Sequence, residues 1–97
     1  MTVTLRYWAA AKDAAGLAEE TYGDVVDLAA LLAAAVAAHP GSGANPGGTG
    51  TGTGRLGQVL ARCSFLVDGD PVGLRDHARV QLRDGAVVEA LPPFAGG

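Results

Sequence analysis

The stretch "DLAALLAAAVAAHP", residues 27–40, decides how the rest of this chain can fold. Five of its apolar side chains recur at helical spacing and give a helix one apolar face. These side chains are Leu28, Leu31, Leu32, Ala35 and Val36. Asp27 stands just before the pattern, where its carboxylate can accept hydrogen bonds from the free amides of a first helical turn. His39 and Pro40 follow the pattern and favour its end. The sequence therefore predicts one main helix with a single face to bury.

Two strands are expected before this helix. The segment "TVTLRYWA", residues 2–9, is β-branched and aromatic, with polar and apolar residues in alternation. Its apolar face comprises Val3, Leu5 and Tyr7, and its other face comprises Thr4, Arg6 and Trp8. A turn with a helical piece around residues 12–15 follows, and a second, short strand is expected near residues 19–22.

A short helix and three more strands are expected after the main helix. The helix lies in residues 55–63, the strands at 64–67, 80–82 and 87–91, and the turns at 68–69 and 84–85. Pro92 ends the last strand, since proline has no amide to donate to a sheet. This order favours an α+β fold, in which a mixed sheet of four to five strands has one main helix packed across it.

Residues 41–54, "GSGANPGGTGTGTG", separate the main helix from the later elements. So few apolar groups cannot offset the entropy of ordering the chain, which predicts a flexible surface loop. A phosphate-binding loop is excluded because Arg55 and Leu56 follow the last glycine, where that motif has lysine and then serine or threonine. A helix, and not a strand, also precedes the segment.

Length and charge limit the classes of function. The 97 residues are enough for one domain, which we assign to residues 1–91, and residues 92–97 form an extended tail. A formal net charge of −3, with scattered arginines, argues against nucleic acid as a partner. No apolar run approaches the length of a membrane span. Cys63 is the sole cysteine, which fits a reducing, cytoplasmic location.

The reactive residue types do not form a convincing site within the domain. Cys63 is expected to be a buried structural thiol, and neither His39 nor His77 has metal-ligand spacing with it. Asp68 and Asp70 resemble the start of a calcium loop but lack the remaining ligands, so a hairpin turn is expected there. We therefore expect no metal and no bound cofactor.

The last seven residues, "LPPFAGG", carry the distinctive chemistry. Pro92 and Pro93 stiffen the chain where it leaves the last strand. Phe94 is an apolar anchor, and beyond it the chain becomes thin enough to enter a slot that would reject a side chain. The carboxylate of Gly97 is a poor electrophile, so another protein would have to activate it with ATP.

This tail resembles the C-terminus of the ubiquitin-like sulfur carriers of the MoaD/ThiS family, and within it most resembles MoaD, the small subunit of molybdopterin synthase. The segments "VTLRYWAAAKDAAG", "DLAALLAAAVAAHP" and "LARCSFLVDGDPV" also resemble the family. The resemblance implies a β-grasp fold. It also implies that an E1-like adenylyltransferase (MoeB/ThiF-like) adenylylates Gly97, which then becomes a thiocarboxylate. In the molybdopterin case, sulfur goes to a pterin precursor inside a large, MoaE-like synthase subunit.

By this resemblance, the chemistry falls on Gly96 and Gly97, and the partner-binding residues are Pro92, Pro93, Phe94 and Ala95. The chain would be no catalyst alone, and ATP would be used by its partner. One departure is Asp84-Gly85-Ala86, where the family usually has Asp-Gly-Asp, so one acidic contact with a partner is in doubt.

Three alternatives stay open at this point. The sulfur acceptor could be a precursor of thiamine or of cysteine. The chain could be a ubiquitin-like modifier, joined through Gly97 to lysines of target proteins. It could also be an interaction module whose tail has no chemistry.

Overall fold

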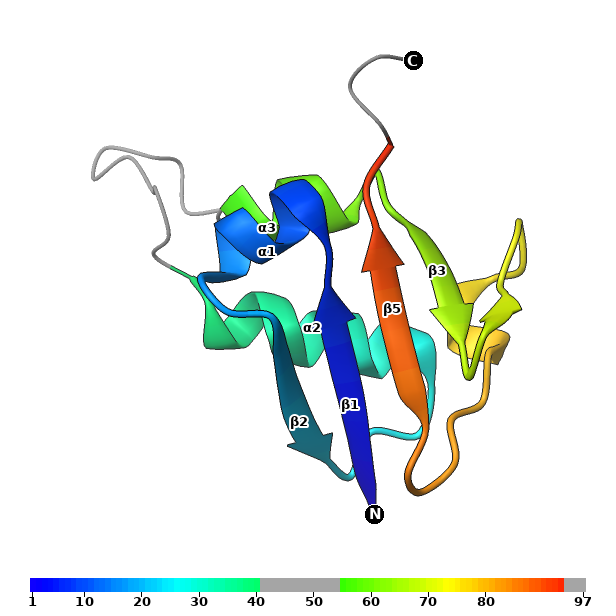
Figure 1. Ribbon diagram of the computed structural model, residues 1–97. Coiled ribbons are helices and arrows are strands. Elements are labelled where there is room, and N and C mark those ends of the chain that lie inside the picture. Colours follow the sequence, from blue (N-terminus) through cyan, green and yellow to red (C-terminus); the bar gives the residue numbers. More distant parts are fainter. Residues whose placement is uncertain (41–54, 94–97) are drawn as a thin grey trace.

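The structure is a computed structural model that describes residues 1–40 and 55–93. In chain order its elements are β1 (Thr2–Tyr7), α1 (Ala9–Ala15), β2 (Glu19–Gly23), α2 (Leu28–Ala38), α3 (Arg55–Leu60), β3 (Ser64–Val67), β4 (Asp70–Pro71), the 3₁₀ helix η1 (His77–Arg79) and β5 (Val87–Leu91). The five strands form one mixed sheet, in the order β2-β1-β5-β3-β4. Helix α2 runs across one face of this sheet, which confirms the expected α+β architecture (Figure 1). The glycine-rich loop predicted at residues 41–54 lies outside the described residues.

The first and last strands pair with each other at the centre of the sheet. β1 and β5 are parallel, in a register that runs from Thr4 opposite Val87 to Tyr7 opposite Ala90. β5 is also antiparallel to β3, so it has a hydrogen-bonded neighbour on each side. Because β1 and β5 point the same way, the start of β1 and the end of β5 lie at opposite ends of the sheet (Figure 1).

The core lies between the sheet and its helices. The three predicted inward residues of β1, Val3, Leu5 and Tyr7, are all buried. From α2, Leu28, Leu31 and Ala35 are buried against them. Leu32 and Val36, which the helical pattern also placed on the apolar face, are half-buried and pack at the edge of the core. The predicted face of α2 is therefore confirmed, with one side of it less covered.

The start of α2 has the expected cap. Asp27 has an extended backbone, and its Oδ1 accepts a hydrogen bond of 2.7 Å from the amide of Ala30. At the other end, the amide of His39 donates to the carbonyl of Val36, which closes the last turn. Both boundaries of the main helix thus lie where the sequence predicts them.

The predicted strand at residues 80–82 is wrong. This segment follows η1 and makes a single isolated bridge, between Asp27 and Gln81, so it is not a strand of the sheet. Val80 and Leu82 are buried as their alternation requires. Their backbone groups, however, pair with the start of α2 and the loop before it: the amide of Leu28 donates to the carbonyl of Val80, and the amide of Leu82 donates to the carbonyl of Val26. The fifth place in the sheet belongs to β4.

A cluster of polar side chains fastens the C-terminal end of α2 to the sheet. Oε2 of Glu20 accepts hydrogen bonds from the hydroxyls of Tyr7 and Tyr22, at 2.5 and 2.8 Å, and lies 2.7 Å from Nε2 of His39. Burial raises the pKa of Glu20, but the bonds from Tyr7, His39 and Tyr22 together lower it below its usual value. Burial, together with the bond to Glu20, also raises the pKa of Tyr22 to about 12. One carboxylate therefore joins β1, β2 and the end of α2.

Replacing Glu20 by glutamine should lower the free energy of unfolding by about 1–3 kcal/mol at neutral pH, because a charged acceptor of several hydrogen bonds is lost. The native pKa of Glu20 is depressed, so its contribution is present above the ordinary value of 4.5 and disappears as the pH falls through the native pKa. Urea unfolding at a series of pH values measures both effects.

The matched control is Glu19→Gln, which removes an exposed carboxylate paired with Arg6 on the surface. That variant should change stability little, since exposed ion pairs contribute little. An equal loss of unfolding free energy in the two variants would contradict the role given to Glu20. So would a Glu20→Gln variant whose stability falls at acid pH as steeply as that of the parent chain.

Candidate functional site

The candidate site is the place where the chain leaves the centre of the sheet. β5 ends at Leu91, which is opposite Ser64 of β3. Pro92 is half-buried against the body of the protein and Pro93 is exposed. The expected end of the last strand at proline is thus confirmed, and the chain emerges from a strand that is held on both sides.

The other predicted site residues cannot be placed. Phe94, Ala95, Gly96 and Gly97 lie outside the described residues, so their expected roles stay predictions. What the structure does supply is the surface from which they start, and its chemistry can be examined residue by residue.

Trp8 lies beside this exit. Its amide donates a hydrogen bond of 3.2 Å to the carbonyl of Ala90, near the end of β5. The residue is 48% exposed and belongs to the few large hydrophobic residues that face solvent in the described part of the chain. The next residue, Ala9, has a φ of +47°, a strained left-handed conformation with which the chain turns from β1 into α1. The turn thus leaves Trp8 exposed, with its backbone bonded to the last strand one residue before that strand ends.

Sequence reasoning placed Trp8 on the polar face of β1 but did not connect it with the tail. The missing information was the pairing of β1 with β5, which brings residues more than eighty positions apart into hydrogen-bonding distance. The one signal in the sequence for an exposed contact residue was a tryptophan on the otherwise polar face of the first strand.

Charged residues lie next to one another on β2, β1 and β5, on one face of the sheet. Arg6 of β1 forms an ion pair of 3.0 Å with Glu19 of β2, and its Nη1 lies 3.8 Å from Oε1 of Glu89 on β5. All three side chains retain contact with solvent, so the pairs add little stability. They do give this face of the sheet alternating charge, with Glu19 on β2, Arg6 on β1 and Glu89 on β5.

Cys63 is not an activated nucleophile. It lies between α3 and β3, half-buried, and its Sγ is 3.3 Å from the carbonyl of Val59. Burial raises the pKa of this thiol to about 11, whereas a reactive cysteine needs a lowered one. The expected structural role of Cys63 is therefore supported, although the side chain is only partly covered.

The remaining residue types of interest are engaged in the fold. Asp68 and Gly69 both have positive φ, as the expected two-residue hairpin turn requires. Oδ1 of Asp68 accepts from the amide of Val87, which ties this turn to the start of β5. The ring of His77 makes an edge-on contact with Phe65 at 5.3 Å. Residues 1–40 and 55–93 contain no group of three or more His, Cys, Asp or Glu that could hold a metal ion.

The acidic turn before β5 lies at the far end of the sheet from the exit. Oδ1 of Asp84 accepts from the amide of Thr2, and Gly85 donates to the carbonyl of Thr2. Ala86, at the position where the resembled family has a second aspartate, is buried. In this chain the turn secures the start of β1 to β5.

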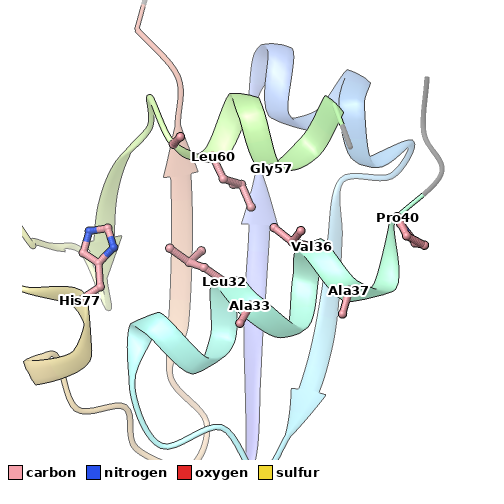
Figure 2. Close-up of a pocket in the computed structure, with 9 residues that line it drawn as sticks. Leu32, Ala33, Val36, Ala37, Pro40, Gly57, Leu60 and His77 are labelled. Carbon is pink, nitrogen blue, oxygen red and sulfur yellow. The ribbon is translucent and has the colours of Figure 1, made fainter. Parts of the chain in front are cut away.

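An apolar groove of about 650 Å³ lies on the helical side of the sheet, between α2, α3 and η1 (Figure 2). Its walls include Leu32, Ala33, Val36, Gly57, Leu60 and His77. His77 is the one polar side chain in its lining, so the groove can hold an apolar group but offers little for a reaction. The tail exit is therefore the stronger candidate site.

Within residues 1–40 and 55–93, no helix is long and apolar enough to cross a membrane.

Comparison with known proteins identifies one family. The sequence profile of the ThiS family matches residues 5–97, and so includes the second half of β1, the main helix, β5 and the tail. No curated protein matches the chain in a search of sequences.

Several solved structures are similar along nearly the whole chain. One belongs to a complex of subunits 1 and 2 of the molybdopterin-converting factor from Helicobacter pylori, with 22% identity, a TM-score of 0.61 and coverage of 100% of both chains. SAMP1 from Haloferax volcanii has 20% identity and a TM-score of 0.69, again over 100% of both chains. Small archaeal modifier protein 1 (SAMP1) from Methanosarcina acetivorans has 18% identity and a TM-score of 0.68, covering 99% of this chain and 96% of its own. At this identity the likeness is one of fold, and it confirms the expected ubiquitin-like β-grasp.

Native Cys63 should react slowly with iodoacetamide, because burial raises its pKa to about 11 and keeps the thiolate scarce. We expect labelling at neutral pH to be at least about tenfold slower than in guanidinium chloride. Intact mass recorded against time measures both rates. Equal rates in the two conditions would show an accessible, ordinary thiol and would contradict this assignment.

Proposed function

This chain belongs to the ThiS family, and from that premise we propose that it is a sulfur carrier whose working group is the carboxylate of Gly97. An E1-like enzyme joins this carboxylate to the AMP part of ATP and releases pyrophosphate. A sulfur donor then displaces AMP, which leaves a thiocarboxylate at the end of the chain. ATP binds to the partner, and this chain supplies the acyl group.

The observation that carries this proposal is the combination of the tail sequence with its point of origin. The family match extends to Gly97, so the tail is part of the family pattern. The tail begins at the end of β5, which is fixed by hydrogen bonds to β1 and β3. Pro92 and Pro93 then limit the directions in which the chain can leave. A partner that grips the domain thus receives the terminus in a restricted volume.

Sulfur transfer to a molybdopterin precursor is the use we favour. The similar Helicobacter pylori structure is a complex of subunits 1 and 2 of the molybdopterin-converting factor. The double proline at residues 92–93 points the same way. On this proposal the chain is the small, non-catalytic subunit, and its tail enters a large, MoaE-like subunit where sulfur passes to the pterin.

Two other uses of the same activated terminus remain candidates. The acceptor could be a precursor of thiamine, which the family name favours, or of cysteine. Alternatively, Gly97 could be joined to lysines of target proteins, and the similarity to small archaeal modifier protein 1 supports this second candidate. In an inert interaction module, by contrast, removing Gly97 would change nothing.

We assign Trp8 to partner binding, together with Pro92, Pro93, Phe94 and Ala95. Its indole is exposed where the tail begins, and a partner that takes up the tail must approach this point. Aromatic residues of this kind often contribute a large share of the binding energy at protein interfaces.

The sulfur-carrier proposal predicts a change in mass. Incubation with an E1-like enzyme, ATP and a sulfur donor should increase the intact mass by the difference between one sulfur and one oxygen atom. Tandem mass spectrometry should locate the change at Gly97 and confirm that this residue is the terminus.

Deletion of Gly97 is the matched control. The variant should keep the circular dichroism spectrum and unfolding midpoint of the parent, since the described core does not include the tail. It should gain no sulfur. An unaltered mass of the full chain, with an enzyme shown to load its own carrier, would refute the proposal.

Replacing Trp8 by alanine should raise the KM of the activating enzyme for this carrier by about tenfold, because an exposed aromatic contact is lost. The value of kcat should change little, since the reacting carboxylate is untouched. Leu74→Ala is the control, because Leu74 is a fully exposed apolar residue in the loop between β4 and η1. Equal effects of the two substitutions would remove Trp8 from the interface.

A further inference from the structure

We propose that Lys12 is an acyl acceptor, through which one copy of this chain becomes covalently joined to Gly97 of a second copy. The inference rests on the proposed activation of Gly97. It adds a modification site on the carrier itself and a second copy of the same chain as the target.

The chain has one side-chain amine, that of Lys12. Lysine and arginine together number seven, and Lys12 is the single lysine among them. Arginine stays protonated and does not serve as an acyl acceptor under ordinary conditions. Cys63 is half-buried with a raised pKa, so its thiol is a poor competitor. Of the lysine, arginine and cysteine side chains, Lys12 is therefore the one we expect an activated terminus to acylate.

Lys12 is available without any change to the core. It lies on the exposed side of α1, whereas Ala11, Ala14 and Ala15 on the other side of that helix are buried. Within the described part of the chain, its ammonium takes part in none of the ion pairs, which involve Arg6, His39 and Arg75. Acylation at Lys12 thus breaks no packing contact and no salt bridge there.

The position of Lys12 relates it to the tail. The amide of Lys12 lies 3.4 Å from the carbonyl of Trp8, and the amide of Trp8 donates to Ala90 near the end of β5. Helix α1 therefore starts at the end of the sheet where the tail begins, and the chain's amino terminus lies at the opposite end (Figure 1). A second copy that presents this end to a loaded enzyme brings Lys12, and not its terminal amine, toward the activated group.

The transfer balances without a redox reagent. The neutral amine of Lys12 attacks the carbonyl carbon of the Gly97 acyl-adenylate, and a C–N bond forms. The C–O bond to AMP breaks, AMP leaves with the electron pair, and the proton from nitrogen passes to solvent. The product is an isopeptide, and the ATP consumed is the one that the activating enzyme already uses.

The test uses the full chain with an E1-like enzyme and ATP, with the sulfur donor omitted so that the adenylate accumulates. Joined copies are measured on denaturing gels, and tandem mass spectrometry identifies the linked residue. The wild-type chain should give a dimer linked at Lys12. Lys12→Arg keeps the charge and should reduce the dimer to the level seen without ATP.

A second variant tests position rather than chemistry. Lys12→Arg combined with Arg83→Lys moves the lysine to an exposed site beside the Asp84-Gly85 turn, at the other end of the sheet. We expect this variant to form as little dimer as Lys12→Arg. Dimer formation restored by the relocated lysine would overturn the argument from position.

ATP–pyrophosphate exchange separates this inference from the proposed function. Three outcomes would overturn the role of Lys12 and leave the carrier proposal standing. They are exchange without joined copies, joined copies that persist in Lys12→Arg through the terminal amine, and a ring closed within one copy. The absence of exchange, with an enzyme active on its own carrier, would overturn both.

Discussion

The parallel pairing of β1 with β5 is the constraint on which the rest of this structure depends. It unites the two ends of the sequence at the centre of the sheet and places everything between them in one long crossover. Parallel neighbours require such a crossover, and here α2 within it covers the face that β1 and β5 must bury. The same pairing sets the end of β5 beside Trp8 and far from the start of β1. Both the core and the exit of the tail follow from it.

The described part of the molecule maintains the fold and presents the start of the tail. Several carboxylates within it hold the fold, as Glu20 does at the end of α2 and as Asp68 and Asp84 do at the turns beside the start of β5. Cys63 is protected by burial. Nothing in residues 1–40 and 55–93 assembles into a catalytic group, and the proposed chemistry accordingly lies in the terminal carboxylate and in the partner that activates it.

Local patterns predicted most of the fold because they report burial directly. The alternation in β1 and the capped helix after Asp27 specify which faces must be covered, and the structure covers them. The same reasoning failed at residues 80–82, since Val80 and Leu82 would be buried equally well in a strand or beside the loop before α2. Alternation identifies a buried face and does not identify the hydrogen-bonding partner.

The candidate site, like the fold, could be predicted from the sequence only where its residues are adjacent in the chain. The tail motif is contiguous, so its sequence was enough to propose its role. The proposed role of Trp8 depends on contact between the first strand and the last, which no window of sequence contains. The cluster around Glu20 escaped notice for the same reason, because its members come from β1, β2 and the end of α2.

The two prolines at the end of β5 have a consequence for how any binding cleft can hold the terminus. Strand addition requires backbone amides, and Pro92 and Pro93 provide none. A cleft that extends its own sheet with this terminus can therefore find backbone N–H donors only from Phe94 onward, although the carbonyls of both prolines can still accept hydrogen bonds. The two missing donors interrupt any continuous ladder between β5 and the sheet of such a cleft, so the terminus could be bound and released while β5 keeps its hydrogen bonds to β1 and β3.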